Sequence, residues 1–164
     1  ISDLATGLMW QKSDDGISRD WQESLAYAES LQLVNKEDWR LPNAKELQSI
    51  VDYSRSPQTT KSPAINPLFE CTEITDPNGN TGHYPFYWTS TSHLEGANPY
   101  ASGVYIAFGE GQGVMNGVLM DVHGAGCQRS DPKSGNKNEY PQFFGPQGDV
   151  RYVYNYVRAV RTIE

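Results

Sequence analysis

The sequence predicts one domain of the α+β class with an antiparallel sheet. Two segments with helical periodicity come first in the chain, and aromatic and β-branched segments typical of strands follow them. Helices and strands that are segregated along a chain are typical of α+β proteins. The 15 glycines and 10 prolines among 164 residues indicate many turns and irregular loops around a single core. We therefore treat residues 1–164 as one domain.

The first expected elements are a strand and a helix. Residues 4–12, LATGLMWQK, have the apolar character of a strand around a glycine. Residues 18–33 contain the clearest helix, because Asp20 can cap it and Glu23 completes a capping box. Apolar residues then recur along one face of this helix at the spacing expected for burial.

The stretch DWRLPNAKEL, residues 38–47, predicts the second helix. Pro42 keeps the residue before it extended, so the chain enters the helix from a strand-like segment. Asn43 can cap the helix, and Glu46 lies three residues later in a variant of the capping box. The apolar spacing that follows predicts a helix over residues 44–53.

The second half of the chain predicts strands and one long loop. We expect a loop over residues 54–85 and strands over residues 85–92, 103–108, 114–120 and 150–163, the third pairing with the second in a hairpin. Residues 121–149 show no sustained periodicity. Loops of this length without secondary structure are uncommon and are usually functional or disordered.

Charge and cysteine content exclude some functions. A net charge of −7 argues against general nucleic-acid binding, which requires a basic face. No apolar run approaches the ~20 residues that span a bilayer, so we expect no insertion into a membrane. Cys71 and Cys127 predict a structural disulfide, which fits an oxidising compartment. Two buried free thiols or a reactive thiol are the alternatives.

Five motifs occur in an order that points to a known family: TGLMWQ, DWRLPNAKEL, YWTSTS, VYIAF and YNYVRAVR. The chain resembles the Lcl C-terminal domain family, a bacterial family named for a collagen-like adhesin. This resemblance implies a C-type-lectin-like fold, distantly related to formylglycine-generating enzymes. In that fold two helices pack on small sheets, the N- and C-terminal strands pair, and long irregular loops bind ligands. Residues 121–149 look like an insert of a subfamily.

The resemblance also assigns roles to the DWRLPN segment and to the cysteines. By analogy Trp39 fills the core beside Trp10 and Trp88, and Arg40 pairs with a carboxylate or with backbone carbonyls. Formylglycine-generating enzymes use two close cysteines with a metal, whereas the cysteines here are far apart in sequence, and Ala159 replaces a frequent cysteine. We therefore expect no enzymatic activity, and such an enzyme is the least favoured alternative.

The long loop supplies the candidate ligand-binding residues. Exposed aromatic side chains can stack on sugar faces or anchor a protein partner, and basic side chains can bind an anionic group. Alternatively, the aromatic residues pin the loop to the core and the basic residues are solvated. The candidates are His123, Arg129, Lys133, Lys137, Tyr140, Phe143 and Phe144.

Calcium is the one cofactor that the loop residues suggest. The ion requires six to eight oxygen ligands, and Asp121, Asp131 and Asp149 lie in or beside the loop. No EF-hand is present, and neither are the triplets of calcium-dependent sugar-binding lectins. The alternative is that these aspartates form turns.

These observations predict a non-catalytic recognition or adhesion module of the extracellular space or the bacterial cell envelope. Its ligand is a glycan or a protein at the cell surface, bound through residues 121–149 and the neighbouring turn at 92–100. The alternative is a structural subunit or decoration domain of a surface assembly, including a homo-oligomer. Nucleic acid is not an expected partner.

Overall fold

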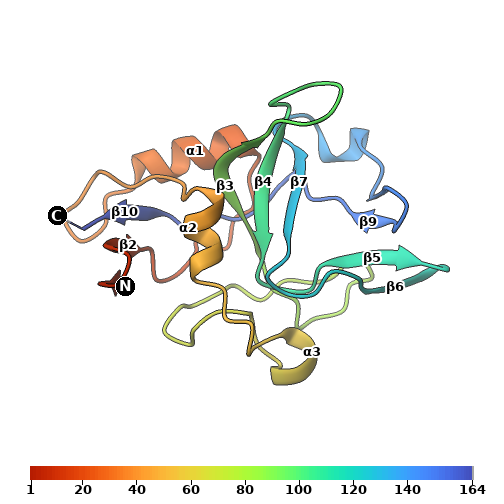
Figure 1. The fold of residues 1–164 in the computed structure, drawn as a ribbon, viewed down its shortest axis with the longest axis horizontal. Coiled ribbons are helices and arrows are strands. Elements are labelled where there is room, and N and C mark those ends of the chain that lie inside the picture. The colour runs from red at the N-terminus through yellow and green to blue at the C-terminus, as the bar shows by residue number, and fades with distance from the viewer. Residues whose placement is uncertain (164) are drawn as a thin grey trace.

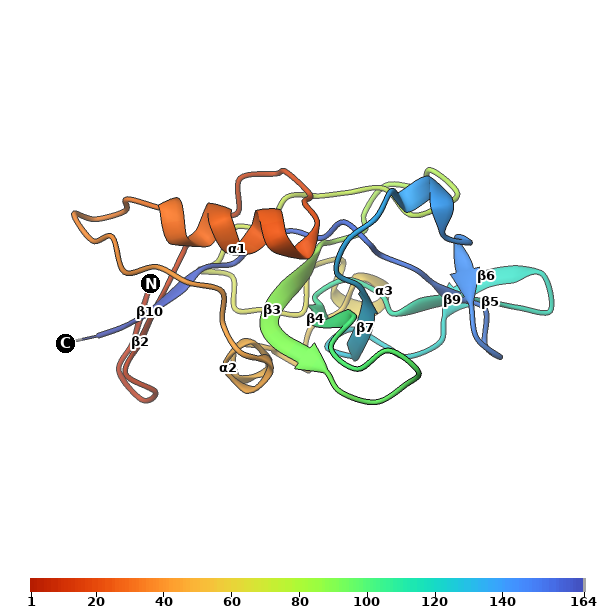
Figure 2. The same ribbon diagram turned by 90° about the horizontal axis from the view of Figure 1, so that it is seen from above.

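The computed structural model describes residues 1–163 as an α+β protein built mainly from short antiparallel strands. Within that range the strands form three small sheets, with two helices and shorter helical turns beside them (Figure 1). The predicted α+β class with antiparallel sheets is therefore confirmed. Both chain termini lie at one end of the molecule, and the hairpin of β5 (Gln112–Met115) and β6 (Val118–Asp121) lies at the other end (Figures 1 and 2).

The first sheet joins the two ends of the chain. Its strands are β1 (Ser2–Asp3), β2 (Leu8–Trp10) and β10 (Val160–Thr162), in that order. β2 and β10 are antiparallel, with Trp10 opposite Val160 and Leu8 opposite Thr162. The predicted pairing of the N- and C-terminal strands is confirmed.

The central sheet contains much of the buried aromatic surface. Its strands are β3 (Phe86–His93), β4 (Ser102–Ala107) and β7 (Gln128–Pro132), in that order and antiparallel. β7 corrects the expectation of a structureless segment over residues 121–149. The sequence of β7, QRSDP, has no apolar alternation, and it becomes a strand because it pairs with β4 along its whole length.

The third sheet corrects the expected hairpin. β5 pairs with β6, and the order continues through β9 (Asp149–Val150) to β8 (Phe143–Phe144). The predicted strand over residues 114–120 is itself split by a tight turn at Asn116 and Gly117, whose φ angles are 53° and 77°. Asn-Gly favours this two-residue turn because both positions require positive φ. The predicted pairing of residues 114–120 with 103–108 is therefore wrong.

Both predicted helices are present with their capping boxes. α1 (Trp21–Ser30) begins after Asp20, and α2 (Ala44–Ser49) begins after Asn43. α2 ends before the predicted residue 53 because the chain leaves the helix to pair Val51 with Ile65. Among the described residues, no helix has the length and apolar character needed to cross a bilayer.

Two short helical turns lie in segments expected to be loops. α3 (Pro57–Thr60) begins after Ser56, whose side chain accepts a hydrogen bond from the Thr59 amide. The 3-10 helix η1 (Lys137–Glu139) begins after Asn136, which caps it in the same way through the Asn138 amide. Such short turns leave almost no periodic signal in a sequence, because they hold a single turn of helix.

The DWRLPN segment is structural, as expected. The guanidinium of Arg40 donates two hydrogen bonds of 2.8 Å to the Glu46 carboxylate and one to the Leu41 carbonyl. Trp39 is buried with Trp88 in one apolar cluster, whereas Trp10 lies in a second cluster. The predicted contact of Trp39 with Trp88 is consistent with this cluster, and Trp10 belongs elsewhere.

The predicted strand over residues 150–163 is wrong in its middle. The chain forms β9 and β10 there, and the residues between them make only isolated bridges, including Arg19 with Asn155. Asn155 and Arg158 are buried polar residues in this connection. Buried polar groups require hydrogen-bond partners, and theirs come from several segments rather than from one neighbouring strand.

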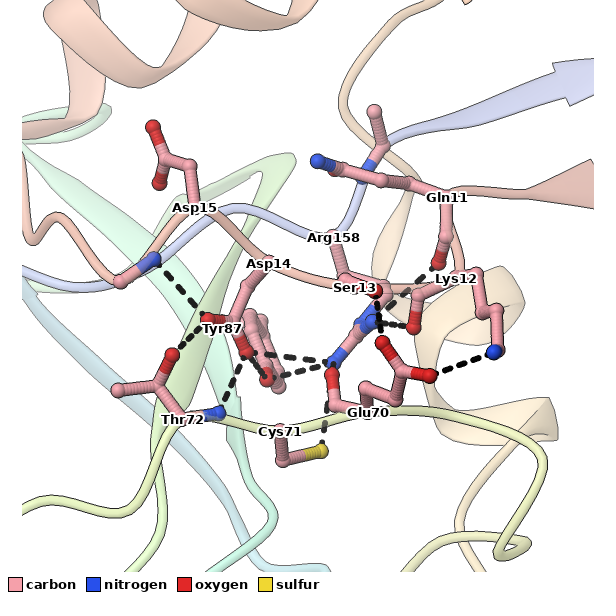
Figure 3. Close-up of polar contacts among 12 residues, drawn as sticks. Gln11, Lys12, Ser13, Asp14, Asp15, Glu70, Cys71, Thr72, Tyr87 and Arg158 are labelled. Atoms are coloured by element: carbon pink, nitrogen blue, oxygen red, sulfur yellow. Dashed lines mark hydrogen bonds and ion pairs between the residues drawn. The ribbon is translucent and has the colours of Figure 1, made fainter. Parts of the chain in front are cut away.

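Arg158 lies at the centre of a buried polar network (Figure 3). Its Nη1 donates to the carbonyl oxygens of Gln11 and Lys12, at 3.2 and 2.5 Å. Its Nη2 donates to the Glu70 carbonyl at 2.9 Å and to the Tyr87 hydroxyl at 2.7 Å. The guanidinium thereby joins β10, β3 and two loops.

Asp14 supplies the negative charge of this network. Its buried carboxylate lies 3.4 Å from Arg158 and accepts hydrogen bonds from the Tyr87 hydroxyl, at 2.6 Å, and from the backbone amide of Thr72. The Thr72 hydroxyl also donates to it. A buried charge is tolerated when it is paired and hydrogen-bonded, and both conditions are met here.

His83 is a buried histidine beside the central sheet. Its backbone pairs with Ile74, and its ring packs edge-on against Phe86 with a centroid distance of 5.4 Å. Burial lowers the pKa of His83 to about 4. The folded protein therefore keeps this imidazole neutral at pH values where an unfolded chain would protonate it.

We predict that protonation of His83 in the unfolded state destabilises the fold in acid. Between pH 6.5 and about 4 the unfolded chain binds one more proton at this residue, so stability falls as the pH falls through this window. Over this whole pH window, the neutral state of His83 lowers the free energy of unfolding by roughly 3 kcal/mol. Urea unfolding of the wild type and of His83→Leu at several pH values measures it, because the difference in unfolding free energy isolates the residue.

His93→Gln is the matched control, since His93 is exposed. Its unfolding free energy should follow the wild-type pH dependence. A His83→Leu variant with the same pH dependence as the wild type would contradict the prediction.

Candidate functional site

Three neighbouring pockets lie where the β3–β4 loop meets the segment from β7 to β9. The Tyr100 pocket has a volume of about 580 Å3, the Pro141 pocket about 460 Å3 and the Phe144 pocket about 330 Å3. Tyr140 borders the first two pockets, Arg151 borders the last two, and Pro132 borders the first and third. We call the three together the loop groove; each volume is within the range of small-molecule sites.

The Tyr100 pocket begins at an exposed aromatic residue held by the loop backbone. Tyr100 has a φ of 66° and its side chain is 63% exposed. Its amide donates to the His93 carbonyl at 3.1 Å, which closes the loop onto the end of β3. Positive φ is uncommon for a bulky residue, and such strain is found more often at functional sites.

Lys133 places a cation on the wall of the Tyr100 pocket. Its Nζ donates to the Ser92 hydroxyl at 2.6 Å and lies 4.1 Å from the centre of the Trp21 ring. Trp21 is fixed in turn by donation to the Thr89 carbonyl and by close packing on Gly103, where a Cβ would lie 2.6 Å from the indole. Burial lowers the pKa of Lys133.

Tyr140 forms the wall between the Tyr100 and Pro141 pockets. Its hydroxyl donates to the Ser134 carbonyl at 3.0 Å. Gly135 lies under the ring with a φ of 109°, and a Cβ there would come within 2.8 Å of the Tyr140 hydroxyl oxygen. The glycine is therefore required both for the backbone conformation and for the position of the ring.

Two ion pairs line the Phe144 pocket. Arg129 on β7 lies 2.9 Å from one carboxylate oxygen of Asp149, and His123 lies 2.7 Å from the other oxygen. Arg151 lies 3.1 Å from Asp131, whose carboxylate also accepts a hydrogen bond from the buried Tyr105 hydroxyl at 2.8 Å. Burial raises the pKa of Asp131.

Arg151 also makes cation–π contacts with the aromatic rings beside the Phe144 pocket. Its guanidinium carbon lies 4.2 Å from the centre of the Phe144 ring and 5.3 Å from that of Tyr140. Phe144 is 60% exposed. Cation–π contacts of this kind fix the orientation of an exposed ring that would otherwise be free to rotate.

The structure brings together most of the predicted ligand-binding residues. Those that line the loop groove are Arg129, Lys133, Lys137, Tyr140 and Phe144. His123 reaches the groove only through its contact with Asp149. Phe143 is next to Phe144 on β8, and because successive strand residues point to opposite faces it turns away from the groove.

Sequence reasoning missed Tyr100 and Arg151. Tyr100 lies in the 92–100 turn, which was expected to adjoin the site, but no residue of that turn was singled out. Arg151 was assigned to a terminal strand and therefore to the sheet. Arg151 could have been predicted as a site residue because it follows the long loop directly in the sequence. In the structure it pairs with a carboxylate of that loop, Asp131.

The aspartates proposed for calcium have other partners. Asp131 and Asp149 pair with arginines, and Asp121 accepts hydrogen bonds from the amides of Gly111 and Gly124, as a turn-forming residue does. Among residues 1–163 no group of three or more His, Cys, Asp or Glu side chains is arranged to hold a metal ion. The geometry therefore gives the calcium prediction no support.

The predicted disulfide is wrong, because Cys71 and Cys127 are both free. Cys71 packs against the cluster that contains Tyr87, and its sulfur lies 3.3 Å from Nη2 of Arg158 (Figure 3). Cys127 packs against the other cluster, behind Gly111. Burial raises the pKa of Cys71, and it raises that of Cys127 to about 11.

We predict that both thiols react slowly in the folded protein and fully after unfolding, without a reductant. Raised pKa values leave little thiolate, which is the reactive form. Titration with a thiol reagent, before and after unfolding in urea, should count two thiols in the unfolded chain, and a Cys127→Ser control should count one. A wild-type chain that shows none, with an intact mass lower by two hydrogens, would instead establish the disulfide.

Comparison with known proteins assigns the chain to a family. The family model described as the Lcl C-terminal domain matches residues 1–119. A search of curated proteins and a search of solved structures found no match. The family match ends inside β6, so β7 and most of the residues that line the loop groove lie beyond it. Because the match covers most of its length, the chain belongs to the Lcl C-terminal domain family.

Proposed function

We propose that this domain is a non-catalytic recognition module that binds a carbohydrate in the loop groove. The observation that carries the proposal is the composition of the Tyr100 pocket. Two tyrosines, a lysine fixed on an indole, and the polar side chains of Gln22 and Asn98 surround one concavity. Sugar rings present apolar C–H faces and hydroxyl edges, which match aromatic rings and polar side chains respectively.

Several features of the fold support the proposal, because they are also expected of a C-type-lectin-like domain. Paired terminal strands, two helices beside small antiparallel sheets and a long irregular region that contains the groove are features of a C-type-lectin-like fold. We include that fold in the proposal. It remains an analogy of architecture, and the residues of the groove carry the functional argument.

The burial of both cysteine thiols supports a non-catalytic role. The two thiols are buried, and burial raises their pKa values, whereas catalytic thiols have depressed ones. Cys71 packs against one apolar cluster and Cys127 against the other, which supports the absence of the close cysteine pair used by formylglycine-generating enzymes.

The proposed setting is the bacterial cell surface or the secreted space. It follows from a recognition role and from the adhesin for which the family is named. The free cysteines give no support to an oxidising compartment, so this part of the proposal does not depend on them. Binding of the purified domain to intact bacterial or host cells, and its loss on groove substitution, would test the setting.

A structural role in an assembly is the second candidate. β6 is an edge strand of its sheet, and the β5–β6 hairpin extends from one end of the molecule (Figure 1). The hairpin carries the exposed side chains of Met115, Val118 and Met120. Exposed apolar edge strands can pair with another chain. Sedimentation velocity at increasing protein concentration separates the candidates: self-association that Val118→Lys abolishes would favour assembly, and a monomer throughout would favour recognition.

We predict that removal of the Tyr100 ring weakens carbohydrate binding at least about fivefold, because ring stacking contributes roughly 1 kcal/mol beyond area burial. A glycan array with the wild-type domain, followed by titration calorimetry with the best glycan, measures the change for Tyr100→Ala. Circular dichroism should show an unchanged fold, because Tyr100 is largely exposed.

Tyr53→Ala is the matched control, since Tyr53 is an exposed tyrosine on the segment after α2. It should leave the affinity unchanged. Equal losses in the two variants would mean that the ring at position 100 has no special role, and binding to no glycan at all would refute carbohydrate recognition.

A further inference from the structure

We infer that the Tyr100 and Phe144 pockets of the loop groove select an uncharged oligosaccharide of at least two sugar units. This inference rests on the proposed function and names the ligand class of the same site. It follows from three properties of these two pockets: the arginines are already paired with carboxylates, the polar groups remain suited to hydroxyls, and the pockets share walls.

The arginines of the Phe144 pocket are neutralised by the protein. Arg129 and Asp149 lie 2.9 Å apart, Arg151 and Asp131 lie 3.1 Å apart, and all four side chains are mostly buried. An incoming carboxylate or sulfate would have to share these guanidinium groups with two carboxylates at close range. Like charges at such distances repel strongly where solvent is partly excluded.

The Tyr100 pocket is also balanced in charge. Lys133 is its cation, and Glu95 lines the same pocket. The ammonium group of Lys133 is already engaged by the Ser92 hydroxyl and the Trp21 ring. Beyond the pocket, a chain with a net charge of −7 repels a polyanion at long range.

Paired ions nevertheless remain good partners for hydroxyl groups. A guanidinium has five N–H donors and a carboxylate has four lone-pair positions, so an ion pair leaves donors and acceptors side by side. Adjacent hydroxyls on a sugar ring both donate and accept, and they match such a pair without changing its charge. Ser102, Ser130 and His93 add further hydrogen-bonding groups to the Phe144 pocket.

Shared walls require a ligand longer than one sugar unit. Ser102 and Pro132 border both the Tyr100 and the Phe144 pockets, and each pocket has an exposed aromatic ring of its own, Tyr100 in the first and Phe144 in the second. A single ring cannot stack on both aromatic groups because they belong to different pockets. Two or more linked sugar units would place one ring in each.

The test uses two series of oligosaccharides, each of one to four units. The uncharged series contains chito-, cello- and manno-oligosaccharides, and the charged series contains oligogalacturonates and heparin fragments. Titration calorimetry on the whole domain should show binding in an uncharged series. Affinity should rise about tenfold from one unit to two or three, and it should change little between ~0.05 and ~0.5 M NaCl, where screening would weaken charge attraction.

Asp149→Asn supplies a gain-of-function test with little change of shape. It removes the carboxylate that neutralises Arg129 and contacts His123. The variant should gain severalfold affinity for oligogalacturonates that high salt abolishes, which a merely structural role of Asp149 would not produce. Circular dichroism and urea unfolding verify that the variant is folded, and Asp52→Asn is a matched exposed control that should gain nothing.

The outcomes separate this inference from the proposed function. Tighter, salt-sensitive binding of a charged series by the wild type would overturn the inference and leave carbohydrate recognition intact. Equal affinities for one unit and for longer chains would overturn the requirement for linked sugar units. Binding of neither series would overturn both proposals.

Discussion

The fold depends on one buried guanidinium. Arg158 brings β10, β3, the chain after β2 and the loop at residue 70 to a single point, through hydrogen bonds to carbonyl groups, to Tyr87 and to Asp14. This matters because the sheets are small and share few backbone hydrogen bonds, so the connection among them cannot come from strand pairing alone. Arginine suits the position since its donors are fixed in one plane and it stays charged when buried. The two apolar clusters pack around this frame, in which both Nη atoms of Arg158 have hydrogen-bond partners.

The loop groove, the site proposed for recognition, is built from other residues than the Arg158 network. The groove residues lie mainly on the β3–β4 loop, β7, η1 and the strands near residue 150. The arginines of the groove are paired locally, Arg129 with Asp149 and Arg151 with Asp131. The structural network and the groove share no ion pair. Groove residues can therefore change with little effect on the frame, which is the arrangement expected for loops that carry function on a rigid scaffold.

Sequence patterns predicted those parts of the fold that depend on local chemistry. The capping boxes at Asp20 and Asn43, the pair of Arg40 with Glu46 and the contact between terminal strands all follow from residue types at short spacing or from a family motif. The errors arose where distant segments decide the structure. β7 is polar and forms because β4 lies beside it. Residues 151–159 leave the strand because the backbone of Asn155 pairs with Arg19 and the side chain of Arg158 donates to the carbonyls of Gln11 and Glu70. The turn at Asn116 and Gly117 has a local sequence signal, the Asn-Gly pair, which the prediction of one continuous strand did not take into account. For the loop groove, the loop residues could be predicted from their aromatic and basic side chains. The carboxylate partners of Arg129 and Arg151 could be identified only from the three-dimensional structure.

The coupling between Arg158 and Asp14 tests the central claim most directly. A double-mutant cycle with Arg158→Lys and Asp14→Asn, measured by urea unfolding, separates the interaction of the pair from the effect of each substitution. Removal of one partner from a buried, hydrogen-bonded pair should lower the free energy of unfolding by roughly 3 kcal/mol or more. The account predicts such losses for both single variants and a double variant that loses clearly less than their sum. Losses below about 1 kcal/mol, or strict additivity within ~0.5 kcal/mol, would contradict it, because the frame would then not depend on this pair.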